Sequence, residues 1–359
     1  MILKDIYSKD FYQILSQVLS SVIPDFNKEK FIKLIFNSEF KDLELKQRMN
    51  HTANVLRQFM PDDVNYVLKI VAKYQQLGIK EEVVEFMFLP EYIANFYLED
   101  YEKSIVVLEK ITEFTSCEFA VRAFIKKYPQ MMEQMKKWSL SSNQHIRRLA
   151  SEGCRPRLPW AIALPQFKNN PQAVLSILEN LKNDESEYVR RSVANNLNDI
   201  SKDNPNIVFK IAKNWLGNNE RTDKLVKHAC RSLLKNGNQQ ALALFGFVAS
   251  KHIKIQNFNL QKYVNIGDKL CFSFEIQTQQ QKLGKCRLEY KIGFMKANNQ
   301  LSNKVFKISE SDIQSNFKLV KKNHSFKIIT TRKYYAGKHS LTIIINGIEV
   351  KKGFFELRQ

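Results

Sequence analysis

The chain has 359 residues, of which 44% are hydrophobic, and this length is enough for about two globular domains with sizeable cores. Its 56 Lys and Arg residues outnumber its 36 Asp and Glu residues, for a formal net charge of +20. Such an excess attracts polyanions, so nucleic acid is the first partner to consider, with a polybasic membrane surface as the alternative. The chain is also rich in Asn and Ile, so base bias in the genome is a competing explanation for part of the lysine excess.

The cysteines and the N-terminal sequence argue against a zinc protein and an exported protein. The N-terminus has neither a continuous apolar signal core nor a small-residue cleavage site, and no stretch approaches the roughly 20 apolar residues of a membrane span. We therefore expect a cytoplasmic protein without a metal or other cofactor. Reduced thiols, without a CxxC pair or a Cys/His cluster of zinc-site spacing, are expected at Cys117, Cys154, Cys230, Cys271 and Cys286.

The first 250 residues read as helices. Up to about residue 100, apolar positions recur at helical spacing, and Pro24, Pro61, Gly78 and Pro90 divide them into short helices. From about residue 104 the helices become regular. We expect them at 104–114, 118–127, 131–140, 145–153, 160–167, 173–181, 188–200, 207–216, 225–235 and 239–248.

Two of these helices share a sequence pattern, an apolar residue followed by a pair of arginines. The segments 145–151 (HIRRLAS) and 188–194 (YVRRSVA) lie 43 residues apart, and 225–230 (LVKHAC) is a looser echo. Such periods are typical of HEAT or armadillo repeats, whose paired helices stack into a curved solenoid and present equivalent residues on one surface. The predicted positive stripe, or in the alternative a row of solvated arginines, comprises Arg147, Arg148, Arg190, Arg191, Lys227 and Arg231.

The stretch 147–160 (RRLASEGCRPRLPW) is expected to form a charged corner. Its apolar spacing predicts a helix that ends near Glu152, with Gly153 as a left-handed cap. Pro159 suits the first position of a new helix, which would carry Trp160. A solvated helix end with a core tryptophan is the competing interpretation. The stiff turn between the two helices carries Arg155 and Arg157.

Three acidic residues accompany arginines on the expected helices. Asp199 follows Arg191 at a spacing of two turns, so both lie on one polar ridge. Each acid has a simple explanation in an ion pair worth a few tenths of a kcal/mol, but their recurrence permits one acidic spot inside a basic surface. The other two acids lie one turn from an arginine, in the pairs Glu118 with Arg122 and Glu152 with Arg148.

The longest motifs carry a family resemblance. The segments 147–160, 186–205 and 228–247 resemble the AlkC branch of the AlkC/AlkD DNA-alkylation-repair glycosylases, and 89–100 and 118–129 fit the same family in order. The resemblance is dense over about residues 85 to 250 and weak over the first 80. It implies a HEAT-like solenoid that excises cationic N3-alkylated bases, 3-methyladenine and 3-methylcytosine, from double-stranded DNA. It also implies that neither a metal nor insertion of the base into a deep pocket is needed.

The resemblance also implies site residues. The acidic positions of the family fall on Glu118, Glu152 and Asp199, and its cleft aromatic falls on Trp160. Around Glu118, Cys117 and Ala123 differ from the residues usual in the family at these positions, but neither difference removes a charged group. Basic positions of the family match Arg148, Arg155 and Arg157, and Arg190 and Arg191 of the stripe complete the predicted DNA-binding set.

Carboxylates in a DNA-binding cleft have a chemical rationale. A cationic alkylated base leaves without a general acid, and the positive charge moves to the sugar as an oxocarbenium ion. Fixed anions beside that sugar stabilise the ion more than the ground state. We expect Asp199 and Glu118 to act at the deoxyribose and the attacking water, with Glu152 contributing to the same spot. Trp160 would provide an aromatic wall with cation–π contact to the lesion.

After about residue 255 the pattern changes to short strands. An antiparallel sandwich of immunoglobulin-like kind is expected, with a hairpin at Asn346-Gly347. The lysines of this part and the segment 334–339 (YYAGKH) would clasp the DNA backbone, although a tyrosine there is more often a corner that supports the fold. The strands are expected at 269–277, 285–295, 325–333, 339–346 and 349–357.

Together these patterns predict a mainly α protein, with a HEAT-like glycosylase domain at 1–252 and an all-β immunoglobulin-like domain at 253–359. We expect a monomer. The competing function is a non-catalytic HEAT adaptor that binds nucleic acid or a protein. A metal-dependent nuclease ranks last, because it would need clustered carboxylates without crowding by arginine.

Overall fold

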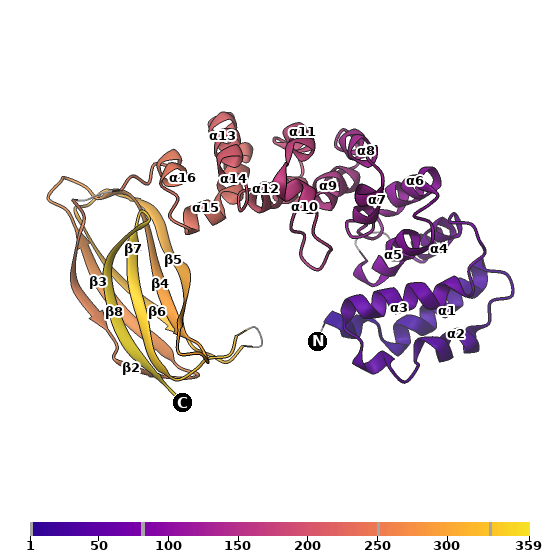
Figure 1. Cartoon of the computed structure of the whole chain (residues 1–359), viewed down its shortest axis with the longest axis horizontal. Helices are drawn as coiled ribbons and strands as arrows, with labels where there is room; N and C mark the ends of the chain where they lie inside the picture. Colours follow the sequence, from indigo (N-terminus) through magenta and orange to yellow (C-terminus); the bar gives the residue numbers. More distant parts are fainter. Residues whose placement is uncertain (1–2, 80–82, 250–251, 330–331) are drawn as a thin grey trace. The chain divides into compact units, whose positions relative to one another are not determined.

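The computed structural model describes residues 3–79, 83–249, 252–329 and 332–359. The chain falls into two compact units, the first made of Met1–Asn204 and Trp215–Ala229, the second of Pro205–Asn214 and Cys230–Gln359 (Figure 1). Helix α13 (Pro205–Trp215) belongs to the second unit except for its last residue. The second unit therefore includes helices that the sequence assigns to the first domain. The expected domain boundary between residues 252 and 253 stays a prediction.

The first unit consists of helices joined by short turns. Several helices begin at a polar side chain that accepts a hydrogen bond from the first turn, as Asn27 does from the Lys30 amide (2.9 Å) and Asn143 from the His145 amide (2.8 Å). Short 3-10 helices lie at Leu3–Ile6, Phe40–Asp42 and Val84–Met87. The α helices are α1 (Lys9–Val22), α2 (Lys28–Ile35), α3 (Leu45–Arg57), α4 (Tyr66–Gln76), α5 (Phe88–Phe96), α6 (Tyr101–Ile111), α7 (Val121–Lys127), α8 (Met131–Trp138), α9 (Gln144–Gly153), α10 (Pro165–Asn169), α11 (Gln172–Leu181), α12 (Glu187–Ile200) and α14 (Glu220–Ala229).

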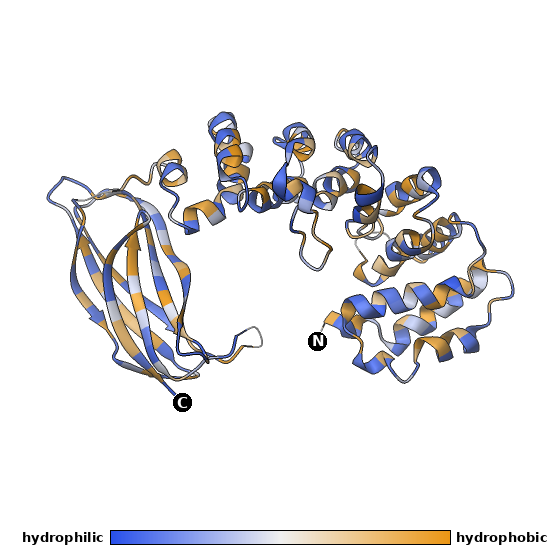
Figure 2. Ribbon diagram, viewed as in Figure 1, coloured by the Kyte–Doolittle hydropathy of each residue, from blue (hydrophilic) through white to orange (hydrophobic). Residues whose placement is uncertain are grey.

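The helices stack in pairs through their apolar faces. Helix α9 packs against α8 and α12, and α12 packs against α14. Leu149 of α9 and Val189 and Val193 of α12 are fully buried in this stack, each stabilising it by roughly 1.5–3 kcal/mol. Figure 2 shows hydrophobic and hydrophilic residues alternating along these helices, as expected where one side faces a neighbour. The two helices that share wording in the sequence are therefore neighbours in a repeat.

Two expectations for the 147–160 corner are wrong. Gly153 is not a left-handed cap: it is the last residue of α9, and a Cβ there would lie 2.5 Å from Val121 Cγ2 and 3.0 Å from Met135 Cε. Its small size allows the close approach of α7 and α8. The expected helix at 160–167 begins only at Pro165, which takes the first helical position that Pro159 was expected to fill.

In the described part of the second unit, α13 is followed by two short helices and eight strands. Its helices after α13 are α15 (Arg231–Lys235) and α16 (Gln239–Leu244), so the expected single helix at 225–235 is divided between α14 and α15. The strands are β1 (Lys254–Leu260), β2 (Tyr263–Asn265), β3 (Lys269–Gln277), β4 (Gly284–Met295), β5 (Leu301–Ile313), β6 (Phe317–Ser325), β7 (Gly337–Ile345) and β8 (Ile348–Arg358).

The strands form two sheets around one apolar core. The orders are β1-β3-β6 and β2-β8-β7-β4-β5, antiparallel except for the parallel pair β2 and β8. Phe274, Leu288 and Leu341 are fully buried between the sheets. The expected strand at 325–333 is wrong: β6 ends at Ser325, and residues 330–331 lie outside the described residues. Strand β5 was missed because its sequence is half polar along an edge of the sheet.

The hairpin between β7 and β8 forms where expected. Asn346 (φ 47°) and Gly347 (φ 79°) both adopt positive φ, as a type I′ turn requires. The Asn346 side chain accepts a hydrogen bond from the Arg287 amide (2.8 Å) and donates to the Val248 carbonyl (2.8 Å). A Cβ on Gly347 would lie 2.5 Å from Leu242 Cδ1, so only glycine fits beside α16.

All five cysteines are free thiols, and only Cys271 is exposed. Burial raises the pKa of the Cys154 and Cys230 thiols to about 12, so neither is a reactive thiolate. Within the described residues, no helix is both long and apolar enough to cross a lipid bilayer.

Candidate functional site

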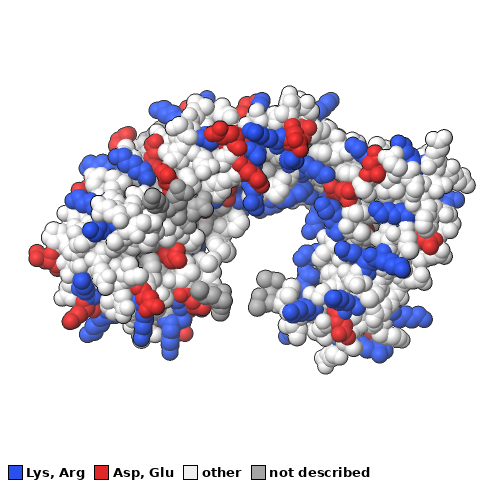
Figure 3. Space-filling model, turned by 180° about the vertical axis from the view of Figure 1, so that it is seen from behind, with Lys and Arg blue, Asp and Glu red and all other residues white. Residues whose placement is uncertain are grey.

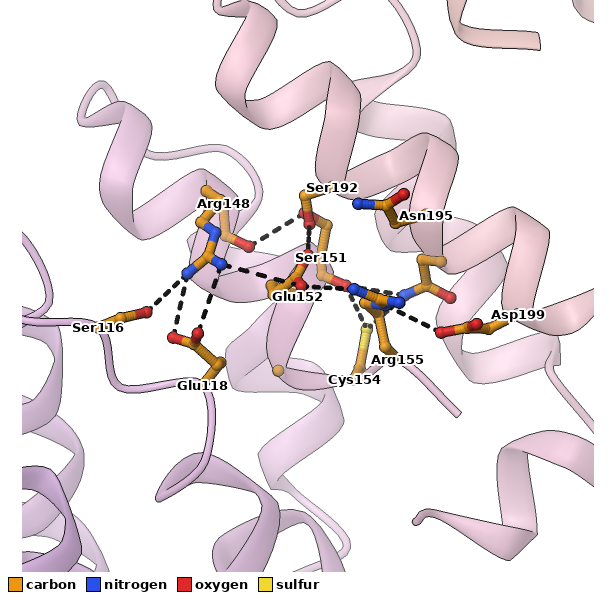
Figure 4. Close-up of polar contacts among 12 residues, drawn as sticks. Ser116, Glu118, Arg148, Ser151, Glu152, Cys154, Arg155, Ser192, Asn195 and Asp199 are labelled. Carbon is orange, nitrogen blue, oxygen red and sulfur yellow. Dashed lines mark hydrogen bonds and ion pairs between the residues drawn. The ribbon is translucent and has the colours of Figure 1, made fainter. Parts of the chain in front are cut away.

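The three acidic residues singled out in the sequence lie in one row across three helical elements. Glu118 lies in the turn that leads into α7, Glu152 in the last turn of α9 and Asp199 in the last turn of α12. Two arginines from the 147–160 corner fill the spaces between them (Figure 4). We call this set the acid–arginine row. Its members are Glu118, Arg148, Glu152, Arg155, Asp199 and Lys202, the last of which contacts Asp199.

Arg148 joins the first two acids of the row. Its Nη1 donates to Glu118 Oε2 at 3.0 Å and to Ser116 Oγ at 2.6 Å, and its Nη2 lies 3.8 Å from Glu152 Oε1. Tyr188 of α12 places its ring centroid 5.0 Å from the guanidinium carbon. Burial lowers the pKa of Arg148, but Glu118 and Glu152 raise it by more, so the net shift is upward and the side chain stays cationic.

Arg155 joins the second and third acids. Its Nη1 donates to Glu152 Oε1 at 2.6 Å and its Nε to Asp199 Oδ2 at 2.9 Å. The other Asp199 oxygen accepts from Lys202 Nζ at 2.9 Å, and the other Glu152 oxygen accepts from Ser192 Oγ at 2.7 Å. The acid–arginine row thus sets three carboxylates against three cations, with every carboxylate in contact with at least one of them.

The row is sheltered from water but borders a cleft. The acid side chains are only 11% (Glu118), 8% (Glu152) and 3% (Asp199) exposed. A cleft of about 410 Å³ is lined by Glu118 and Glu152, whereas Asp199 lies behind Arg155 and is not part of its lining. Two of the three carboxylates therefore face the cleft directly in this state.

The other side of the cleft is apolar and comes from the N-terminal third of the chain. This apolar wall gives the first 80 residues, whose sequence is least similar to the family, a place beside the acid–arginine row. The spacing of apolar residues in these segments is the same for a cleft wall as for a core, so it does not indicate such a role. The wall consists of Leu3, Leu45, Met49, Val83, Val84, Met87 and Phe119.

Comparisons with known proteins bear on this arrangement. Residues 79–233 match the model of a family described as DNA alkylation repair enzyme, and residues 254–359 match that of the C-terminal Ig-like domain of the uncharacterised protein YhaZ. The uncharacterized protein YhaZ of Bacillus subtilis (strain 168) is 42% identical over 352 residues, 97% of each chain. The solved structure of Pseudomonas fluorescens alkylpurine DNA glycosylase AlkC, bound to DNA containing an abasic site analog, superposes with a TM-score of 0.94 at 33% identity over 100% of both chains. The chain belongs to the AlkC family.

Membership of the AlkC family confirms the resemblance inferred from the long motifs. It also confirms the fold class, mainly α with HEAT-like helices and an immunoglobulin-like β sandwich at the C-terminus. The roles of individual residues are not tested by this membership and stay predictions.

Trp160, the expected cleft aromatic of this AlkC-family chain, lies in a turn rather than on a helix. It is 66% exposed, lines the cleft and has a positive φ of 63°. It is therefore not the core tryptophan of the competing interpretation. A bulky residue in the left-handed region is strained and persists only where its surroundings hold it.

The predicted phosphate-binding arginines differ in what they contact. Arg157 is exposed and makes a bidentate pair with Asp203 at 3.1 and 2.6 Å. Arg190 donates to the backbone carbonyls of Asp184 (2.6 Å) and Glu185 (2.8 Å) and so partly braces the turn before α12. A groove of about 760 Å³ between α12 and α14 is lined by charged residues that include Glu187, Arg190, Arg191, Glu220, Arg221 and Lys224.

The expected positive stripe needs correction. Arg147 does not face outward, because its Nε donates to Asp184 Oδ2 at 2.6 Å and only 10% of its side chain is exposed. Arg148 faces the acid–arginine row instead. On the face drawn in Figure 3, Lys and Arg side chains gather most densely near the middle of the view, with some Asp and Glu side chains beside them.

Several residues at the site were not predicted from the sequence, or were predicted with the wrong partner. The predicted pair of Glu118 with Arg122 is wrong: Glu118 precedes α7, and Arg122 donates to backbone carbonyls. Ser116, Ser192 and Lys202 were not identified as site residues, although Ser192 and Lys202 lie in the segment 186–205 and Lys202 follows Asp199 at a spacing that suits an ion pair. Among the described residues, no group of three or more His, Cys, Asp and Glu side chains is arranged to hold a metal ion.

Proposed function

We propose that this DNA alkylation repair glycosylase of the AlkC family excises cationic N3-alkylated bases, 3-methyladenine and 3-methylcytosine, from double-stranded DNA. In this proposal it acts as a monomer, without a cofactor and without inserting the base into a deep pocket. The observation that carries the proposal is the acid–arginine row beside a cleft that holds an exposed tryptophan.

The proposed reaction is hydrolysis of the N-glycosidic bond. The bond between C1′ and the base nitrogen breaks, and its electron pair neutralises the charged ring, so the base departs without a proton donor. The sugar becomes an oxocarbenium ion, which nearby carboxylates stabilise. A water oxygen then bonds to C1′, and its proton passes to a carboxylate. Asp199 and Glu118 are proposed to act at the sugar and the water, and Glu152 to strengthen the same negative field.

DNA binding offers a way to free these carboxylates from their arginine partners. Arg155 holds both Glu152 and Asp199 in the free protein. A DNA phosphate is an equally good bidentate acceptor for a guanidinium group. If Arg155 turns toward a phosphate, Asp199 loses one of its two cations at the moment when a cationic nucleotide arrives. The acid–arginine row would thus exchange a protein cation for the charge of the lesion.

The remaining predicted residues position the strand. Trp160 is proposed to contact the lesion nucleotide through its exposed ring. Arg148, Arg157, Arg190 and Arg191 are proposed to bind phosphates, helped by the net charge of +20. The solved relative is an alkylpurine DNA glycosylase with DNA bound, which supports DNA as the partner of this chain.

Asp199→Asn tests this proposal directly. The variant removes one charge and keeps the shape of the side chain, so we expect DNA affinity to be retained while release of methylated bases falls by about 100-fold. Free bases released from methylated DNA are separated by chromatography and counted. Unchanged release would refute the role of Asp199. A wild-type protein that binds DNA but releases no base would instead indicate a non-catalytic adaptor.

A further inference from the structure

Arg122, in the first turn of α7, is a fully buried cation beside the acid–arginine row. Its Nη1 donates to the Gly153 carbonyl at 2.9 Å and to the Arg155 carbonyl at 2.7 Å. Its Nε donates to the Ile162 carbonyl at 2.7 Å, and Nη2 contacts the same oxygen. Its described hydrogen bonds thus go to backbone oxygens rather than to a carboxylate.

These three carbonyls bracket the turn 154–164. Gly153 ends α9, Arg155 is the second residue of the turn, and Ile162 lies shortly before α10. The turn is closed further by hydrogen bonds from the Leu164 amide to the Pro156 carbonyl (3.2 Å) and from Ala161 to Leu158 (3.3 Å). One guanidinium group therefore ties the beginning of the turn to its end.

The turn carries residues that need support from below. Trp160 is largely exposed, so its ring gains little from packing, yet its backbone adopts the left-handed region at φ 63°. Arg155 extends from the same turn into the acid–arginine row. Both residues are placed by a segment without regular secondary structure, which on its own would sample several conformations.

The choice of arginine is costly and specific. A buried cation without a carboxylate partner is unfavourable, and burial lowers the pKa of Arg122 to about 10. The group still stays charged at neutral pH. The planar guanidinium presents donors in fixed directions and reaches three separated carbonyls at once, which a lysine ammonium cannot do from one position. The free-energy cost of burying this cation is consistent with a role in fixing the geometry of the turn rather than in adding stability.

We propose that Arg122 is a positioning residue that sets the turn 154–164, so that Arg155 and Trp160 meet the lesion nucleotide together. The inference rests on the proposed function only for the contact with the nucleotide. That the turn depends on Arg122 is a statement about the free protein and is testable without DNA.

The first measurement uses Trp160 as a probe. The chain has three tryptophans, and Trp138 and Trp215 are buried. Replacing both with Phe leaves Trp160 as the sole tryptophan. In that background Arg122→Lys should lower the fluorescence anisotropy of Trp160 and increase its quenching by acrylamide, because the turn becomes mobile. Arg287→Lys is the control: Arg287 is also buried, and its partners Glu289 and Glu310 belong to the sandwich rather than to the lining of the cleft.

The second measurement is single-turnover base release from methylated DNA. Arg122→Lys should lower the rate constant by about 100-fold, the effect expected of a displacement near 1 Å, while DNA affinity changes little. Arg287→Lys should release bases at the wild-type rate. Wild-type anisotropy and wild-type release in the Arg122 variant would overturn the proposal. If the wild type releases no base but Arg122→Lys still mobilises Trp160, the proposed function fails and the positioning role stands.

A second variant covers the case in which Arg122→Lys does not fold, as judged by circular dichroism. Pro159→Gly loosens the turn from within and removes no buried group, since Pro159 is exposed. It should lower both the anisotropy of Trp160 and the rate of base release. A rate unchanged by this substitution would show that the rigidity of the turn does not matter, and would overturn the proposal.

Discussion

The acid–arginine row and a cluster in the sandwich both hold a buried arginine between carboxylates, and the difference between them identifies the candidate site. In the sandwich, Arg287 contacts Glu289 at 2.5 Å and also Glu310. Glu289 follows on the same face of β4, and Glu310 is the direct partner of Arg287 in β5, so sheet register alone brings them together. The acid–arginine row joins residues from three separate helical elements and borders a cleft. Burial of ion pairs is therefore common to both, and the cleft distinguishes the row.

Removing one charge from each cluster should separate their roles most clearly. Glu152→Gln weakens the negative field at the cleft, so we expect base release to fall by about 100-fold in a single-turnover assay. Glu310→Gln removes a charge from the sandwich cluster and should leave the rate of release unchanged. Equal rates in both variants and the wild type would mean that the row is structural in the same sense as the sandwich pair.

Acid should affect the sandwich through His324. The His324 ring is buried beside Tyr290, with 2.9 Å between the Tyr290 hydroxyl and Nδ1, and burial lowers its pKa to about 4, helped by Arg332 and Lys304. Because the folded pKa lies below the unfolded value of about 6.5, the neutral ring stabilises the fold fully above pH 6.5, and this contribution is lost as pH falls toward 4. The loss is about 3 kcal/mol at most.

Denaturant unfolding at a series of pH values measures this effect. In His324→Phe the loss of unfolding free energy between pH 6.5 and pH 4 should be smaller than in the wild type. Base release in the same variant at pH 7.5 should be unchanged, because His324 lies in the sandwich core. An identical pH dependence in both proteins would contradict the assignment to this histidine.

The smallest expected effect is on DNA affinity and comes from Arg157, an exposed arginine near the acid–arginine row. Arg157→Ala removes one exposed cation near the row, so DNA binding should weaken and the slope of log affinity against log salt should decrease by about one phosphate contact. Fluorescence titration of labelled duplex DNA at several salt concentrations gives both quantities. A slope equal to that of the wild type would argue that Arg157 serves only its pair with Asp203.

Sequence patterns predicted the helical stack and grouped the three acids, because apolar spacing and repeated wording report on regular helices. They failed where a turn decides the geometry. Pro159 is suited to start a helix, but in the packed structure the next helix, α10, begins at Pro165 instead. Gly153 looked like a cap by position, whereas its neighbour Val121, distant in sequence, explains it.

The partner of Arg122 illustrates the same limit. Its spacing from Glu118 suits an ion pair on one helix, but Glu118 lies before α7, and Arg122 instead reaches carbonyls some thirty to forty residues away in sequence. Backbone acceptors leave no trace in side-chain patterns. The apolar wall of the cleft was missed for a related reason, since its members come from turns and from helix faces shared with the core.

The span of the cleft lining, from Leu3 to Tyr188, has a consequence for biosynthesis. A chain leaving the ribosome exposes most of the apolar wall long before the acid that completes the row, Asp199, has emerged. Incomplete chains therefore expose apolar side chains that are meant to line the cleft, and such surface favours aggregation until the rest of the chain has folded. Translation must pass the middle of the message before this protein possesses its chemistry.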